Sequence, residues 1–536
     1  MGKLLWALLT VICCANALHA GAPNSSFLII YTNDRHGYLQ PAQHPVTGEA
    51  VGGVAHEATL LRKVRRAARR EKIPVLTVDA GDLFQGTPVV NATKGKCMVD
   101  VYNKLGYHLI TFGNHEFDYG QEILLQRMRE SRFIWVSSNI ESSYLGQHFV
   151  PYVTYDLAGT KIAFLGITTI TTPNITYPKN TEGIVFKEPR EVLPPLIERL
   201  KRDSGVKVVV LLSHMGNQSD EWLARRVEGI DLIIGGHSHT RLLEPAKVRN
   251  TWIVQASCNS RYVGLARITL GADGTVQTIR AKLREVLHSL YPADADVQKI
   301  VESYTQDLDV RLDEVVGTTT APILRGFTGI DSPMGIICAD SYRAATETEI
   351  GIMNVGGVRA GLNEGPVTMR QLMLISPFQN SVVKMNLLGK DLHNLIERSL
   401  SGIWHEIPED KKQMWKEAGR GKIAGKIPGK RKIGFLVGAG LKYSFDTSRQ
   451  PGQRLLKVEA LGKPLEMERK YSVSMNSFLA FGGDGFAEFT RGTEIIDTKI
   501  NDSDALRLYF QQKGTVSPPT EVSAENLTVQ ISSEGR

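Results

Sequence analysis

Five short segments of the chain carry side chains that commonly bind metal ions. Each follows an apolar run of the kind that forms a buried strand. Because open α/β sheets place their sites at the carboxyl ends of strands, we expect the five segments to meet. Such a set could hold two divalent ions, whose chemistry is the hydrolysis of phosphate esters. The segments are residues 32–36, 80–82, 113–116, 213–216 and 235–239.

The candidate ligands combine oxygen and nitrogen donors. This mixture suits Zn²⁺, Mn²⁺, Fe or Co better than Ca²⁺, and the absence of thiolates argues against a structural zinc site. One carboxylate must bridge ions that lie about 3.5–4 Å apart, and Asp82, which follows a glycine, is the best candidate. The candidate metal ligands are Asp34, His36, Asp82, Asn114, His214, His237 and His239.

The elements that must position these ligands indicate two domains. A chain of 536 residues is too long for a single core. Apolar runs alternate with helical patterns over residues 25–290, as in a layered α/β domain. Helical spacing over residues 294–316 predicts one connecting helix. A second α/β domain is expected over residues 318–515, and residues 516–536 form a polar tail.

The first 20 residues have the pattern of a signal peptide. Lys3 precedes an apolar run, and small residues follow it. No later stretch is long and apolar enough to span a bilayer, and the polar C-terminus lacks the tail of a lipid-anchor signal. We therefore expect a secreted, extracellular protein without a membrane anchor. Sequons for glycosylation occur at Asn24, Asn91, Asn174, Asn217, Asn501 and Asn526.

Three cysteines remain after the expected signal peptide, namely Cys97, Cys258 and Cys338. An odd number means that at least one thiol is free or pairs between chains. They are too far apart in sequence for a zinc finger, and a large core does not need disulfides. We expect mostly buried thiols without a special role.

The net charge of +7 is concentrated in a predicted insertion, residues 405–433, whose basic part begins at Lys411 and ends at Lys432. It is either a solvated loop or a contact for an anionic partner, such as a glycosaminoglycan or an acidic protein face. Aromatic residues do not recur through it as single-stranded nucleic-acid binding requires, so nucleic acid is not an expected partner.

Taken together, the five segments resemble those of the calcineurin-like metallophosphoesterases, and more closely the 5′-nucleotidase/apyrase family, whose Asn-His-Glu signature matches residues 113–118. The resemblance implies a four-layer α/β/β/α domain, a bridging helix and a C-terminal α/β nucleotide-binding domain. It also implies that Asp82 is shared between two divalent ions, for which Zn, Mn, Co, Mg and Ca are candidates. The first ion would be held by Asp34, His36, Asp82 and His239, and the second by Asp82, Asn114, His214 and His237. Position 239 often carries an amide in relatives, but imidazole ligates at least as well.

Two further residues complete the expected catalytic site. His115 and Asp118 are three residues apart on a turn and can meet, so that Asp118 orients the imidazole. His115 would then donate a hydrogen bond to the phosphoryl oxygen as charge builds in the transition state. The alternative is that Asp118 only caps the following helix.

The second domain resembles the family's nucleotide-binding domain in two places. Residues 353–359 match its Asn-Gly-Gly-Gly-Ile-Arg loop, which implies that Asn354 lies near the base or ribose and that Arg359 contacts phosphate or the ribose edge. Phe378 and Phe486 stand in the segments whose rings sandwich a purine, and stacking is worth about 1–3 kcal/mol per base. The chain departs from the family at residues 331–336, and Arg325 is the one candidate for an upstream arginine.

These patterns predict a secreted two-metal hydrolase that converts ATP and ADP to AMP and phosphate. Because no anchor signal is seen, the protein resembles the soluble apyrases in the saliva of blood-feeding arthropods. Removing ATP and ADP there would block platelet aggregation. Two alternatives remain open, namely a 5′-nucleotidase that converts AMP to adenosine, and a secreted binding protein that keeps the fold without catalysis. The chain lacks a Walker-type loop, which argues against a P-loop ATPase.

Overall fold

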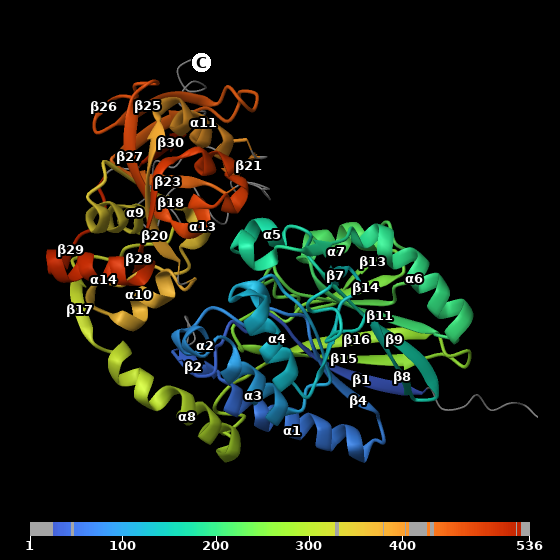
Figure 1. Cartoon of the computed structure of the whole chain (residues 1–536). Helices are drawn as coiled ribbons and strands as arrows, with labels where there is room; N and C mark the ends of the chain where they lie inside the picture. Colours follow the sequence, from blue (N-terminus) through green and yellow to red (C-terminus); the bar gives the residue numbers. More distant parts are fainter. Residues whose placement is uncertain are drawn as a thin grey trace, which may run out of the picture.

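The computed structural model describes residues 25–43, 48–326, 332–378, 380–401, 404–406, 426–428, 434–520 and 523–526. Two α/β domains are joined by helix α8 (Ala295–Leu312) (Figure 1). The expected signal peptide, most of the basic stretch and the end of the polar tail lie outside the described residues. None of the helices in the described part is long and apolar enough to cross a membrane.

The N-terminal domain contains two six-stranded sheets. In hydrogen-bonding order, the first sheet consists of β16 (Val276–Glu285), β15 (Tyr262–Leu270), β1 (Ser26–Thr32), β4 (Val75–Asp79), β5 (Leu109–Thr111) and β6 (Ile134–Val136). The second consists of β13 (Ala246–Val248), β14 (Thr251–Val254), β12 (Leu232–Gly235), β11 (Val208–His214), β9 (Thr160–Thr168) and β8 (Tyr152–Leu157).

Helices cover the outer face of each sheet, which completes the four layers. The first sheet packs against α1 (Val54–Arg70), α3 (Lys96–Leu105) and α4 (Gly120–Glu130). The second packs against α6 (Pro189–Ser204) and α7 (Asn217–Ala224). The α/β/β/α arrangement predicted for this domain is confirmed.

Strand β1 shows why the apolar runs are continuous rather than alternating. Its Phe27, Ile29 and Tyr31 point into the core between the two sheets, whereas Ile30 points into the core beneath the helices. A strand buried on both faces needs apolar side chains throughout. Parallel pairing of β1 with β4, and of β11 with β12, then brings the carboxyl ends of these strands together.

The connecting helix is shorter than expected. It ends at Leu312, and strand β17 (Val315–Thr319) begins within the range predicted as helix. Val297 and Val301 are buried in the core that the N-terminal domain forms under α1 and α3. The first half of α8 is therefore packed against that domain and is not a free spacer.

The C-terminal domain is built on a mixed five-stranded sheet, with two smaller sheets beside it. The main sheet orders β23 (Leu436–Ala439), β18 (Ile350–Asn354), β27 (Lys470–Asn476), β20 (Ser381–Leu388) and β28 (Thr493–Asn501). The others are β26 (Lys463–Pro464), β25 (Leu455–Ala460), β24 (Leu441–Phe445) and β30 (Ala524–Asn526), and β19 (Gly365–Thr368), β17 and β29 (Thr515–Val516).

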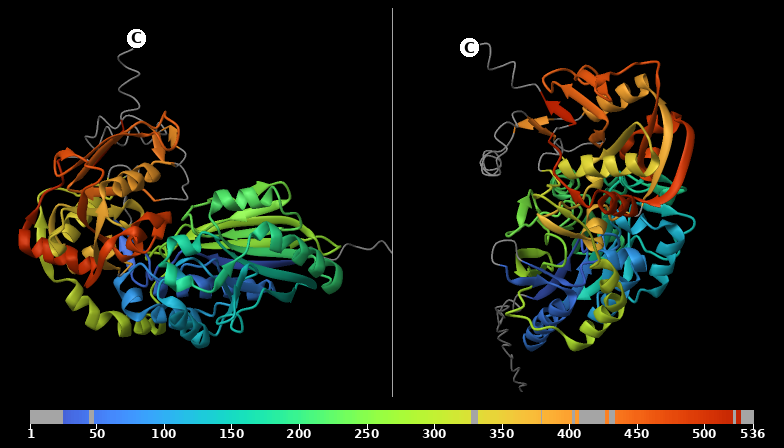
Figure 2. Two further views of the ribbon diagram at one scale, coloured as in Figure 1. Left: turned by 45° about the horizontal axis from the view of Figure 1, so that its top comes forward. Right: turned by 90° about the vertical axis from the view of Figure 1, so that its left-hand side faces the viewer.

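Helices complete this domain, and a short strand pair marks the predicted insertion. The helices are α9 (Pro333–Thr346), α10 (Met369–Ile375), α11 (Gly389–Ser399), α13 (Ser477–Ala480) and α14 (Asp502–Lys513). Strand β21 (Trp404–Glu406) pairs with β22 (Lys426–Pro428), and the basic residues between them lie outside the described part of the chain. Figure 2 shows the C-terminal domain against one end of the N-terminal layers.

Candidate metal centre and substrate interface

The five ligand segments converge at the carboxyl ends of β1, β4, β5, β11 and β12. Ligand atoms of Asp34, His36 and His239 lie within 4.8 Å of one another, and so do those of Asp82, His214 and His237. Ligand atoms of His36, Asp82 and His115 also lie within this distance, so the structure brings together the side chains expected to hold the two ions. The His36 and His239 Nε2 atoms are 3.1 Å apart, and His214 Nε2 lies 3.0 Å from Asp82 Oδ2.

The backbone at this site is held in an uncommon conformation. Five candidate ligands have φ in the left-handed region, at 51° for Asp34, 49° for His36, 62° for Asp82, 71° for His237 and 54° for His239. Residues other than glycine adopt this region rarely, and clusters of such residues occur at functional sites. Tight turns at the strand ends thus aim the side chains inward.

Close backbone approach explains two of the neighbouring glycines. A Cβ atom on Gly113 would lie 2.0 Å from Asp82 Oδ1, and one on Gly81 would lie 2.4 Å from the Gly113 nitrogen. Any side chain at either position would separate the turns that carry Asp82 and Asn114. The glycines therefore allow these two ligands to meet.

The donor set fits divalent cations. Asn114 Oδ1 is buried, and no hydrogen-bond donor in the described part of the chain reaches it. A buried oxygen without a donor is costly unless a cation or water satisfies it. Together with the facing imidazole nitrogens of His36 and His239, it forms a cage of acceptors that suits metal binding.

Two imidazoles at the site have pKa values shifted in opposite directions. Burial alone would lower the pKa of His214, but Asp82 and Asp34 outweigh it and raise the value to about 10. Burial, followed by the charge of His214, lowers the pKa of His237 to about 3. Metal ions bind neutral imidazole, so loading the site would displace the protons held between histidine and aspartate.

Glu116 frames the turn that carries Asp82, a role that the sequence alone did not indicate. Its buried carboxylate accepts hydrogen bonds from the backbone N–H groups of Gly113 (2.6 Å), Asp82 (2.9 Å), Leu83 (2.7 Å) and Phe84 (3.2 Å). Burial, together with the nearby Asp82 charge, raises the pKa of Glu116 to about 7. This one side chain joins the turns after β4 and β5. The position of Glu116 in the Asn-His-Glu motif was the sequence signal that could have predicted this role.

His115 and Asp118 form the expected pair. His115 Nδ1 lies 2.6 Å from Asp118 Oδ2, and the pKa of His115 is raised because Asp118 and Asp82 outweigh the effect of burial. The Thr176 hydroxyl donates to Asp118 Oδ1 at 2.7 Å, and the Asn180 amide donates to the Asp118 carbonyl at 2.8 Å. Asp118 is thus fixed by residues that have no recognisable motif in the sequence.

The loop after β14 supports the turn that carries Asp34. The Asn33 amide donates to the Ser257 carbonyl at 2.5 Å, and its Oδ1 accepts from the Ala256 N–H at 2.8 Å.

Cys258 in this loop is half-buried and hydrogen-bonds to the His239 imidazole. The three thiols are all free, and Cys97 and Cys338 are buried as expected. Cys258, however, touches a candidate metal ligand, so the expectation of a thiol without a special position does not describe it.

Two residues of the C-terminal domain reach the metal centre. The Phe378 ring lies 5.9 Å from the His115 ring, centroid to centroid, and the Arg359 guanidinium lies 5.7 Å from the Phe378 centroid. Arg359 is also close enough to His115 to oppose its protonation. The predicted base-binding and phosphate-binding residues Phe378 and Arg359 therefore face the predicted catalytic histidine.

Asn91 joins the domains at the same place. Its amide donates to the Pro377 carbonyl at 2.6 Å, and its Oδ1 accepts from Tyr119 Oη at 2.8 Å and from the Gly86 N–H at 3.1 Å. Only 1% of the residue is exposed. Its sequon is therefore inaccessible to a glycan in the folded chain, and its role is to connect the domains.

The other two predicted substrate residues are not open to a ligand in this arrangement. Phe486 is fully buried in the core of the C-terminal domain, where its ring lies 6.0 Å from that of Phe489. Asn354 is 4% exposed and uses both ends of its amide, donating to Asp484 and accepting from Asn476. In this arrangement the Phe486 ring packs inside the domain, and a base sandwich between Phe378 and Phe486 stays a prediction.

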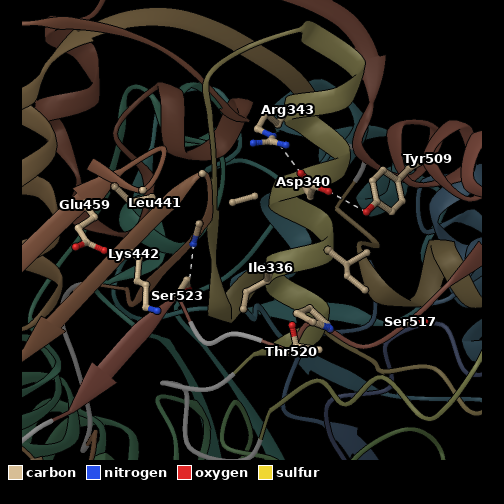
Figure 3. Close-up of a pocket in the computed structure, with 16 residues that line it drawn as sticks. Ile336, Asp340, Arg343, Leu441, Lys442, Glu459, Tyr509, Ser517, Thr520 and Ser523 are labelled. Atoms are coloured by element: carbon tan, nitrogen blue, oxygen red, sulfur yellow. Dashed lines mark hydrogen bonds and ion pairs between the residues drawn. The ribbon is translucent and has the colours of Figure 1, made fainter. Parts of the chain in front are cut away.

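A hollow of the C-terminal domain lies elsewhere, between α9, β24 and the segment after α14 (Figure 3). Its volume is about 500 Å³. Asp340 accepts from Tyr509 Oη at 2.8 Å and pairs with Arg343 at 3.1 Å. The candidate metal ligands are not among its lining residues, so it does not belong to the metal centre.

Comparisons with known proteins agree with this geometry. Residues 27–241 match the calcineurin-like phosphoesterase family, and residues 315–491 match the 5′-nucleotidase C-terminal domain. The chain is 26% identical to the trifunctional nucleotide phosphoesterase protein YfkN of Bacillus subtilis, over 92% of this chain and 34% of that protein. It is 27% identical to bovine 5′-nucleotidase, over 92% of this chain and 89% of the relative. The structure of a 5′-nucleotidase precursor from Thermus thermophilus superposes with a TM-score of 0.81 at 28% identity, covering 94% of this chain and 99% of the other.

Proposed function

The chain belongs to the 5′-nucleotidase family of calcineurin-like metallophosphoesterases, which makes it a metal-dependent nucleotide hydrolase, and we propose that it converts ATP and ADP to AMP and phosphate. The observation that carries the proposal is the approach of Phe378 and Arg359 to His115 across the domain boundary. A base on Phe378 would leave its phosphates between Arg359 and the metal ligands.

The residues divide the chemistry among them. Two divalent ions, held by the Asp34 and Asp82 groups, would activate water and neutralise charge on the phosphoryl group. The His115 imidazole, oriented by Asp118, donates a hydrogen bond to a phosphoryl oxygen as negative charge develops there. Thr176 and Asn180 keep Asp118 in place, so the donor is already aligned before the substrate arrives.

A second arginine favours substrates with more than one phosphate. Arg325 lies near Arg359, and partial desolvation, followed by the Arg359 charge, lowers the pKa of Arg325 to about 10. Two adjacent guanidinium groups repel each other, and a chain of phosphates between them would relieve that repulsion. This supports ATP and ADP over AMP.

Hydrolysis of AMP to adenosine is the second candidate. It is favoured by the bovine and Thermus thermophilus relatives, whose names describe 5′-nucleotidases. The choice depends on where bound nucleotide places its phosphates relative to the metal ligands.

We further propose that the enzyme is secreted and acts on extracellular nucleotides, with inhibition of platelet aggregation during blood feeding as its role. Secretion rests on the signal-like pattern of residues 1–20. ADP released at a wound would be removed by this reaction.

Phosphate release from ATP, ADP and AMP tests the function. The purified protein is assayed with each of Zn²⁺, Mn²⁺, Co²⁺, Mg²⁺ and Ca²⁺, with and without EDTA, beside His115→Ala. We expect release from ATP and ADP, its loss in EDTA, and little release by the variant. Release from AMP alone would select the 5′-nucleotidase alternative. If no nucleotide releases phosphate, while platelet aggregation is still inhibited, the protein acts by binding and the enzymatic proposal is wrong.

A further inference from the structure

A second charged hollow lies on the outer layer of the N-terminal domain, between α1, the end of α3 and the start of α8. We call it the α1 groove. Its volume is about 500 Å³. In Figure 1 these helices lie along the lower side of the molecule, whereas α5 and α13 mark the region where the domains meet. Its charged lining residues are Arg62, Arg65, Arg66, Arg69, Lys104, Asp294 and Asp296.

The positive charge of the α1 groove is only partly balanced. Arg62 pairs with Asp294, and Lys104 Nζ lies 2.9 Å from Asp296 Oδ2. Arg65 donates to two backbone carbonyls and a threonine hydroxyl at 2.6–3.1 Å.

Two arginines are left over. Arg66 and Arg69 are exposed, and neither forms an ion pair with any residue in the described part of the chain. They are three residues apart and therefore stand on neighbouring turns of one helix face. Their guanidinium groups are available to an anion from solution.

Further cations extend this charge onto the first sheet. Arg267 Nη1, on β15, lies 3.0 Å from Glu71 Oε2, at the end of α1, so the helix end adjoins the sheet. On β16, Lys282 is opposite Leu265 and Arg284 is opposite Val263. Residues opposite each other share a face, and Val263 packs in the core beneath α1. Lys282 and Arg284 therefore point to the same side of the sheet as α1.

We propose that the α1 groove binds a sulfated polysaccharide. Arg62, Arg66 and Arg69 follow the helix axis over about 10 Å at 1.5 Å per residue, which suits a linear chain that carries repeated anionic groups. Guanidinium groups bind such oxyanions through paired N–H donors. Binding here would retain a secreted protein on the extracellular matrix.

Other polyanions fit the groove less well. Its apolar lining residues are Ala58, Leu61, Leu105 and Val297, each 8% exposed or less, so nothing is available to insert into a lipid surface. Aromatic side chains, on which single-stranded nucleic acid would stack, do not line it.

Binding of the full-length protein to a size-defined heparin oligosaccharide, measured by calorimetry at physiological salt, tests the proposal. Four proteins are compared: the wild type, Arg66→Glu/Arg69→Glu, Arg190→Glu/Arg199→Glu on the exposed side of α6, and a protein in which the lysines and arginines of residues 411–432 are replaced by glutamine. The second double variant carries the same charge change on another helix. Thermal unfolding checks that each variant is folded.

We expect the Arg66/Arg69 variant to bind at least about 10-fold more weakly, since each basic side chain near an anionic surface contributes a factor of about five. The α6 variant should bind nearly as the wild type does. Unchanged binding by a folded Arg66/Arg69 variant, or loss only in the 411–432 variant, would overturn the proposal. So would tighter binding to phosphatidylserine vesicles or to a DNA oligonucleotide than to heparin.

Discussion

Asp82 at the metal centre and two buried aspartates of the C-terminal domain have pKa values shifted in opposite directions. In the N-terminal domain, burial would raise the pKa of Asp82, but His214 and His115 outweigh it and hold the pKa well below its usual range. In the C-terminal domain, Asp484 and Asp502 have no basic partner among the described residues, and burial raises their pKa values to about 6 and about 7. Burial is similar, so the neighbouring charges decide the outcome.

The difference shows what each carboxylate does. Asp82 stays ionised among imidazoles, as the predicted bridging ligand of two cations would have to. Asp502 accepts from the Ser376 hydroxyl at 2.5 Å and from the Ser503 N–H at 2.9 Å, next to the loop that carries Phe378. A negative charge on Asp502 would be buried without a cationic partner, which would lower the free energy of unfolding. The Asp82 charge serves chemistry, whereas the carboxylates of Asp484 and Asp502 serve packing.

The largest effect is expected from Asp82→Asn. The change keeps the shape of the side chain but removes the charge expected to bridge the two ions, so kcat should fall by about 1,000-fold or more, with loss of bound metal. Steady-state kinetics and metal content of the dialysed protein measure both. Asp502→Asn is the matched control, because it removes a buried charge outside the metal centre and should leave kcat within about twofold. Equal losses of kcat in the two variants would contradict the different roles assigned to Asp82 and Asp502.

His115→Ala should lower kcat by about 100- to 1,000-fold, as is typical for removal of one transition-state donor. The fall should appear in kcat more than in KM, because the hydrogen bond strengthens only as charge develops. Thr176→Val removes a group that acts only through Asp118, so a smaller loss of about tenfold is expected. A normal kcat in His115→Ala would leave the metal ligands as the whole catalytic site.

Phe378→Ala and Phe486→Ala should separate substrate binding from packing. Phe378 is partly exposed beside His115, so its loss should raise KM by about 5- to 150-fold, equivalent to about 1–3 kcal/mol of stacking. Phe486 is fully buried, so its loss should lower the free energy of unfolding by about 3–5 kcal/mol. Kinetics and urea denaturation measure the two. A raised KM at full stability in Phe486→Ala would show that this ring swings out to bind the base.

The smallest effect concerns the dependence of stability on pH. Because the folded pKa of Asp502 is raised from 3.8 to about 7, the folded state binds the extra proton, and stability falls as pH rises from about 4 to about 7. Asp502→Asn should therefore be more stable than the wild type by about 1–3 kcal/mol at pH 8, with the advantage shrinking toward pH 4. Urea denaturation at several pH values measures it. If the stability advantage of Asp502→Asn instead grew toward low pH, the pKa of Asp502 would not be raised in the folded state.

The N-terminal site was predictable because each ligand carries a local signal. Asp34, Asp82, Asn114, His214 and His237 each follow an apolar run that could hardly be anything but a strand. Parallel pairing then brings strand ends together whatever the details of packing. Thr176 and Asn180 could not be found in this way, since they reach Asp118 from a loop 58 and 62 residues later along the chain.

The substrate side was less predictable for a physical reason. Phe378 and Phe486 both stand in recognisable turns, but a phenylalanine fits a core as well as it fits a base. Phe378 faces the metal centre, whereas Phe486 packs among apolar neighbours. Asn91 shows the same ambiguity, because its sequon suggested a surface glycan and its amide instead joins the domains.

The sequence by itself determined the candidate metal ligands, the strands that they follow and the presence of two α/β domains, because strand periodicity and ligand chemistry are local properties. Only the tertiary structure decided which carboxylates stay charged, which phenylalanine is open to a ligand and which arginines of α1 lack partners. Those properties depend on neighbours brought in from distant parts of the chain. Electrostatic interactions and burial are set by distance in space, which spacing along the sequence does not specify.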